Sequence, residues 1–236
     1  PEGWLKYAYQ TAVSILYPQD DLNHAPAQRD AAICFLQFLR TLFDAERNAL
    51  PFDPWLDFAF CTEEELKTCT LADDYRQFLR RFREEYVYEL LRLGHEVTPF
   101  RTLEHIAGVH HVSMTVSRAF KAEGGLIDLA LMSGAAAGHD IGKFGCKPGE
   151  RVPYLHYFYT DQWFAAHNLK SLGRIAANHS VWDLEIENLS SESLVLVYAD
   201  FRVKQSRGED GQELARLFSL KEAFDVILEK LDNVDD

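Results

Sequence analysis

The apolar positions of this chain recur mostly at steps of three and four residues, the spacing of a helix with one buried face. This spacing predicts helices over residues 31–43, 73–93 and 214–231. Alternating patterns typical of strands are hard to find. Glycine and proline interrupt the periodic runs at 18–26, 51–54, 94–99, 124–125 and 142–153. We therefore expect an all-α protein built as a bundle of helices.

The composition is that of a globular protein with one sizeable core. The chain has 236 residues, of which 47% are hydrophobic. No stretch approaches the roughly 18 consecutive apolar residues of a membrane span, and the first residues lack the pattern of a secretory signal. The cysteines form no CxxC pair, which favours free thiols in a reducing compartment. We expect a cytoplasmic protein without a membrane partner.

The charge of the chain bears on its partners. Lysine and arginine total 24 against 37 aspartate and glutamate residues, a net charge of −13. A surface with this bias repels phosphate polymers, so long nucleic acid is not expected as a partner. A small anionic ligand remains compatible with it, because a bound metal and a few local cations can reverse the potential inside one pocket.

The histidines are concentrated in one part of the chain. Seven of the nine lie between residues 105 and 179, whereas the first 95 residues hold the other two and no chemical motif. We interpret residues 1–95 as a helical extension or subdomain with a structural or regulatory role. Residues 96–210 are expected to form the helical core that carries the chemistry, and residues 211–236 a C-terminal helix that packs on it.

The strongest local motif is GAAAGHDIGKFG at residues 134–145, in which a helix of small residues leads into His139 and Asp140. Neighbouring side chains on a helix point roughly 100° apart. The pair can therefore bind one cation, or two adjacent cations, only where the helix end distorts, and Gly138 and Gly142 would permit this. The alternative interpretation is a polar helix terminus without a metal.

A second histidine is expected to face the core. Residues 104–120 have a helical pattern, with apolar or small residues 4, 7, 8 and 11 positions after His105. A core-facing histidine needs a hydrogen-bond partner or a metal. The corresponding positions after His111 are more polar, so His111 is the fallback ligand, and His110 is expected at the surface.

Asp200 follows a run of mostly apolar residues and is expected to face the interior of a helix bundle. A buried carboxylate is costly without a cation or several hydrogen-bond donors. A metal shared with His105, His139 and Asp140 would remove that cost. Pairing with Arg202 or with a backbone amide is the alternative.

This pattern resembles the HD-domain phosphohydrolase superfamily, in which a histidine, a His-Asp pair and a distant aspartate lie on successive helices. The matching residues are His105, His139-Asp140 and Asp200, within residues 100–205. Branches with two metals, such as the HD-GYP cyclic dinucleotide phosphodiesterases and the bacterial diadenosine tetraphosphate hydrolases, have two further histidines between the pair and the last aspartate.

His167 and His179 resemble those two further histidines. The match to the HD-GYP branch is incomplete, because Asn178-His179 stands where that branch has two consecutive histidines, and no GYP tripeptide follows. The resemblance therefore does not extend to cleavage of cyclic dinucleotides.

The resemblance implies two divalent transition-metal ions. One would be bound by His105, His139, Asp140 and Asp200, and the other by Asp140, His167 and His179. Iron and manganese are the preferred ions, with zinc, nickel and magnesium as alternatives. Asp140 would bridge the ions, and a metal-bound hydroxide would attack the phosphorus of a small phosphorylated substrate, such as a nucleotide or dinucleotide.

Several basic and polar residues could contact the phosphate of such a substrate. Lys143, four residues after His139, is the first candidate and is also expected to assist catalysis. The full set of substrate-contact candidates is Lys143, Arg101, Arg151, Tyr154, His156 and Lys204.

Two other interpretations stay open. The same ligands could bind a metal or a nucleotide without turnover, in a signalling module whose N-terminal helices transmit the state. The histidines could also be purely structural, which would require protein groups to satisfy every buried histidine and aspartate. The sequence sets neither the substrate, nor the metal, nor the oligomeric state.

Overall fold

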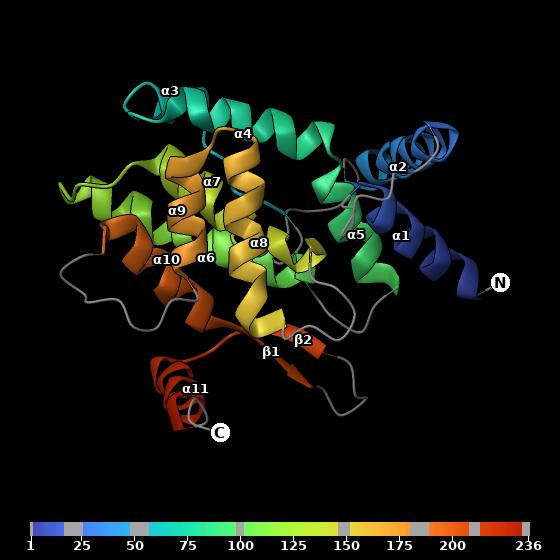
Figure 1. The fold of residues 1–236 in the computed structure, drawn as a ribbon. Helices are drawn as coiled ribbons and strands as arrows, with labels where there is room; N and C mark the ends of the chain where they lie inside the picture. The colour runs from blue at the N-terminus through green and yellow to red at the C-terminus, as the bar shows by residue number, and fades with distance from the viewer. Residues whose placement is uncertain are drawn as a thin grey trace.

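The computed structural model describes residues 2–16, 26–47, 57–97, 102–145, 152–179, 189–207 and 213–232. Its helices are α1 (Glu2–Leu16), α2 (Pro26–Arg47), α3 (Glu63–Leu66), α4 (Ala72–Glu84), α5 (Val87–Val97), α6 (Thr102–Ala122), α7 (Leu129–Gly138), the 3₁₀ helix η1 (Ile141–Gly145), α8 (Val152–Ala166), α9 (Lys170–Asn178), α10 (Ser191–Arg202) and α11 (Leu220–Asp232). One antiparallel hairpin joins α10 to α11, with strands β1 (Val203–Arg207) and β2 (Glu213–Leu217). The predicted all-α class is confirmed (Figure 1).

Helix α7 lies at the centre of the bundle and packs against α4, α6 and α9. Its small residues allow this close packing. A Cβ atom added at Gly134 would lie 2.3 Å from a methyl carbon of Leu172, and one added at Gly138 would lie 2.6 Å from the ring of Phe164. Helices α8 and α9 lie side by side, and α10 packs against α6 on the same bundle (Figure 1). The run GAAAG therefore brings the end of α7 into the core.

The N-terminal helices share the hydrophobic core of the bundle. Helices α1 and α2 pack against each other and against α5, and Leu36 of α2 and Leu90 of α5 belong to the same buried cluster as Leu172. Helix α5 also crosses residues 95 and 96, where the sequence placed a domain boundary. The division into domains itself stays a prediction. Among the described helices, none combines the length and the apolar character needed to cross a membrane.

Two of the expected helices have different boundaries. The helix predicted over 73–93 is broken between α4 and α5, where Tyr86 has a φ of +55°. The helix predicted over 214–231 begins only at Leu220, because the preceding residues form β2, which pairs with β1. The hairpin lies against α6, and the backbone N–H of Ala215 donates to the Glu104 carboxylate. It therefore closes the bundle beside the first turn of α6.

Candidate metal centre

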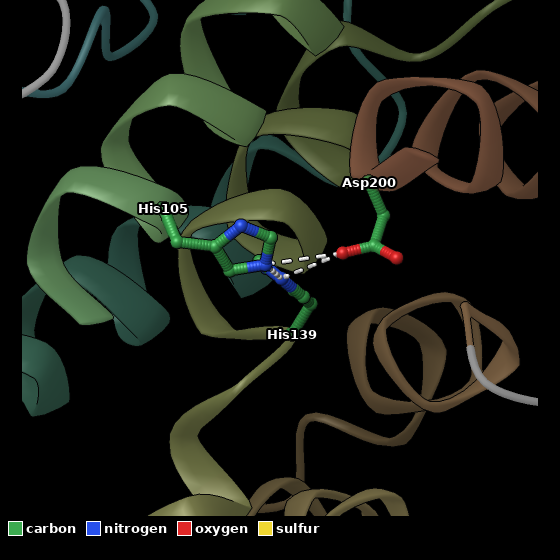
Figure 2. Close-up of side chains that lie close together, drawn as sticks. All are labelled: His105, His139 and Asp200. Atoms are coloured by element: carbon green, nitrogen blue, oxygen red, sulfur yellow. Dashed lines mark hydrogen bonds and ion pairs between the residues drawn. The ribbon is translucent and has the colours of Figure 1, made fainter. Parts of the chain in front are cut away.

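Side chains from five segments meet in the interior of the bundle. They are His105 of α6, His139 and Asp140 at the end of α7, His156 of α8, His179 at the end of α9, and Asp200 of α10. All six are buried. Figure 2 shows His105, His139 and Asp200 pointing toward one another from three different segments. The structure thus collects histidines and aspartates that are up to 95 positions apart in the sequence.

The first group of ligand atoms contains His105, His139 and Asp200. The Nε2 atom of His105 lies 3.1 Å from Oδ1 of Asp200 and 3.4 Å from Nε2 of His139. Nε2 of His139 lies 3.9 Å from the same Asp200 oxygen. Metal–ligand bonds of about 2.0–2.2 Å separate the ligand atoms of one ion by roughly 3–4 Å. These three side chains could therefore hold a metal ion.

A second group contains His139, Asp140 and His179, and could also hold an ion. His156 adjoins it, because its Nε2 atom lies 3.0 Å from Nε2 of His179 and 3.5 Å from Oδ1 of Asp140. The two groups share His139 and come together at the Asp140 carboxylate.

The two oxygens of Asp140 face different histidines. Oδ2 lies 3.5 Å from Nε2 of both His105 and His139. Oδ1 lies 3.5 Å from His156 and 3.8 Å from His179. One buried carboxylate is therefore shared between two pairs of imidazoles.

Backbone carbonyls set the tautomers of two of these histidines. Nδ1 of His139 donates to the carbonyl oxygen of Ala136 at 2.8 Å, and Nδ1 of His179 donates to that of Ala176 at 2.5 Å. Burial lowers the pKa of His139 to about 4 and that of His179 to about 3, so both rings are neutral near pH 7. Each Nε2 atom then turns a lone pair toward the Asp140 carboxylate. A cation between them would remove this repulsion, so the donor set fits a metal.

Two lysines balance the negative charges of the buried carboxylates of Asp140 and Asp200. Nζ of Lys143 lies 2.5 Å from Oδ2 of Asp140, and Nζ of Lys204 lies 2.8 Å from Oδ2 of Asp200. Burial alone would raise the pKa of both carboxyls, but these ammonium groups and the neighbouring histidines hold both pKa values well below the usual range. Both aspartates are therefore ionised. The basic side chain that pairs with Asp200 besides His105 is Lys204, whereas Arg202 donates to the carbonyl oxygen of Phe218.

His167 lies apart from these groups, in contrast to the sequence-based assignment. It directly follows α8, and its Nε2 atom contacts the Glu85 carboxylate. Its Nδ1 atom contacts the carbonyl oxygen of Trp163 at 2.6 Å. Both ring nitrogens are thus engaged at the C-terminal end of α8, whereas His156, near the other end of that helix, reaches the cluster. The sequence treated His156 only as a substrate contact.

His110 is a second correction, because it is fully buried and does not lie at the surface. Its Nδ1 atom accepts a hydrogen bond from the backbone N–H of Ala59, and its Nε2 atom lies 2.8 Å from Oγ of Ser133. The segment that contains Ala59 covers this face of α6, a contact that helical periodicity does not reveal. Of the other candidates, Arg101, Arg151 and the side chain of Tyr154 lie outside the described residues.

His110 should make the stability of the metal-free protein sensitive to acid. Burial lowers its pKa in the folded chain to about 3, whereas an unfolded histidine has a pKa of about 6.5. Between these values the unfolded chain binds the extra proton. The free energy of unfolding should therefore fall as the pH falls, by about 1.4 kcal/mol per pH unit for this residue.

Denaturant unfolding at pH 7, 6 and 5 would measure this effect. The window stays above the unfolded carboxylate pKa of about 4, so histidines dominate the slope. His139 and His179 act in the same direction, and the contribution of His110 is the difference between the parent and His110→Gln. We expect a shallower slope in the variant, and identical slopes would contradict the assignment.

Comparison of this chain with protein-family models, with curated proteins and with solved structures gave no match. The interpretation of the buried cluster therefore depends on its own geometry and chemistry.

Proposed function

We propose that this chain is a metal-dependent phosphohydrolase of the HD-domain type, which hydrolyses a phosphate ester or anhydride bond in a small, nucleotide-like molecule. The observation that carries the proposal is the Asp140 carboxylate, which faces two pairs of buried histidines. A carboxylate shared in this way is the arrangement expected of a ligand that bridges two cations about 3.5–4 Å apart.

The proposed ligand sets follow the two oxygens of Asp140. The first set is His105, His139, Asp140 and Asp200. The second set is Asp140, His156 and His179, with His156 in place of His167. Imidazole and carboxylate ligands suit iron and manganese, with zinc and nickel as alternatives, and magnesium is less suited because it prefers oxygen. When bound, such ions activate water for attack on phosphorus and stabilise negative charge on the phosphoryl oxygens.

The protein's own residues would bind and orient the phosphate. Lys143 and Lys204 approach the carboxylates from two different elements, η1 and β1, and both side chains are partly exposed. An ammonium group has three donors, so each lysine could keep its aspartate contact and also donate to a phosphoryl oxygen. Asp140 and Asp200 are ionised and the rings of His139 and His179 are neutral near pH 7, which suits these side chains to ligand roles.

Metal removal tests this proposal. We expect the purified chain to contain a transition metal and to hydrolyse a phosphate ester, such as bis(p-nitrophenyl) phosphate or p-nitrophenyl phosphate. Chelation should lower the rate more than roughly 100-fold, and Mn²⁺ or Fe²⁺ should restore it. The measurements are elemental mass spectrometry and release of p-nitrophenol, followed by a panel of nucleotide and dinucleotide phosphates.

Two results would count against the proposal. A chain that binds metal with normal affinity and hydrolyses nothing in the panel would support the alternative of a metal- or nucleotide-sensing module without turnover. A chain that takes up no iron, manganese or zinc after reconstitution would show that the histidine cluster is structural.

A further inference from the structure

A buried hydroxyl group forms hydrogen bonds with both ends of the turn that carries Asp140. Thr160 of α8 is fully buried, and its Oγ1 atom donates to the carbonyl oxygen of His139 at 3.0 Å. The same atom accepts a hydrogen bond from the backbone N–H of Gly142, also at 3.0 Å. One side chain therefore holds both ends of the turn His139–Gly142, with Asp140 between them.

The turn and α8 are also in direct backbone contact. A Cβ atom added at Gly142 would lie 1.8 Å from the carbonyl oxygen of His156 and 2.4 Å from the backbone nitrogen of Thr160. Because no side chain separates the two segments, η1 lies directly on the turn of α8 between His156 and Thr160. The Thr160 hydrogen bonds fix where along α8 the turn sits.

This contact joins two of the segments on which the proposed metal centre depends. Asp140 lies in the turn, whereas His156 lies on α8, one helical turn before Thr160. Oδ1 of Asp140 must stay close to His156 while Oδ2 stays close to His139. Ligand positions must hold to within about 0.5 Å for a metal to bind well, so a small slide of the turn along α8 would separate the second set.

We propose that Thr160 is a positioning residue, which sets the register between the Asp140 turn and His156 and so makes binding of a second ion possible. The inference rests on the proposed function, since it assumes that both ligand sets bind metal. A purely structural role for Thr160 would be to satisfy two buried backbone groups, and its loss would then lower stability without changing metal binding by the folded chain.

The test compares Thr160→Val, which keeps the side-chain volume and removes the hydroxyl, with Thr160→Ser, which keeps the hydroxyl. Calorimetric titration of the metal-free chain with Mn²⁺ measures the affinity for each ion. Thr160→Val should bind the first ion as the parent does and the second roughly 10- to 100-fold more weakly. It should also lose the electron paramagnetic resonance signal of a coupled manganese pair, whereas Thr160→Ser should keep both the affinity and the signal.

Ser133→Ala is the matched control, because it also removes a buried hydroxyl, one that contacts His110 and Tyr75. It should bind both ions as the parent does. Circular dichroism and thermal unfolding establish that each variant is folded. If Thr160→Val does not fold, Thr160→Ala takes its place with the same expectation.

The possible failures are distinguishable. A parent that takes up no Mn²⁺ would overturn the proposed function and this inference with it. A parent that binds two ions, together with a folded Thr160→Val or Thr160→Ala variant that does the same, would overturn this inference alone. Loss of the second ion in Thr160→Ser would also overturn it, because the hydroxyl would then not be the group that matters.

Discussion

Asp140→Asn is expected to abolish metal binding at the second set and to weaken it at the first, with a loss of hydrolytic activity of more than roughly 100-fold. Even residues that only orient a metal ligand cost up to about 100-fold when they are removed, and Asp140 is proposed to contact both ions directly. Asparagine keeps the size of the side chain, so the packing around it should persist. Elemental analysis and phosphate-ester hydrolysis measure the two effects.

The control for Asp140→Asn is Asp73→Asn, because the Asp73 side chain is almost fully exposed on α4. It makes the same change in charge, far from the cluster in the sequence, and should leave metal content and activity unchanged. An Asp140→Asn chain that folds and retains its full complement of metal would refute the bridging role. Lost activity with full metal content would instead limit Asp140 to a role in the chemical step.

His156→Ala is expected to lose one ion, whereas His167→Ala should keep the metal content of the parent. The reason is the placement of the two side chains, with His156 beside Asp140 and His167 on the Glu85 carboxylate. His167→Ala should instead lower the free energy of unfolding by about 1–3 kcal/mol, since it removes hydrogen bonds from partly buried groups. Metal analysis and denaturant unfolding of both variants separate these outcomes.

The two variants control for each other, because each truncates a histidine carried by or next to α8. The reverse result, with metal lost in His167→Ala and retained in His156→Ala, would restore the ligand set implied by the family resemblance and refute the one based on geometry. Loss of metal in both would indicate that the two truncations act through the packing of α8.

Local sequence patterns were sufficient for four members of the cluster. The inward position of His105 follows from helical periodicity, because the residues that share its face are apolar or small. The inward position of Asp200 follows from the run of mostly apolar residues before it. His139 and Asp140 follow from a helix of small residues that ends in a polar pair. These patterns are local, so they can be recognised without knowing which helices pack together.

The choice between His156 and His167 could not be made from periodicity. The two residues are 11 positions apart, which returns a helix to within about 20° of the same face. They are also separated by about 16 Å along the helix axis, so both cannot reach the same ion. Deciding between them requires knowing which end of α8 lies beside Asp140. That depends on the contact between Gly142 and the α8 backbone.

Other differences between the sequence-based predictions and the structure also arise from contacts between segments that are distant in the sequence. His110 is buried because a distant segment covers α6, and Ala59 of that segment donates to its ring. The break between α4 and α5 occurs at Tyr86, a residue type that rarely adopts a positive φ, so the sequence carries no turn signal there. Strand β2 has the apolar spacing of the helix that follows it, and only pairing with β1 distinguishes the two.

The ligand side chains come from α6, α7, α8, α9 and α10, and an unfolded chain could not present them together. Any cation held by this cluster would therefore bind the folded chain more tightly than the unfolded chain and shift the folding equilibrium by mass action. Proteases cleave the unfolded fraction, so the lifetime of the protein in a cell would depend on the supply of metal. Depletion of the metal would then reduce the amount of protein as well as its activity.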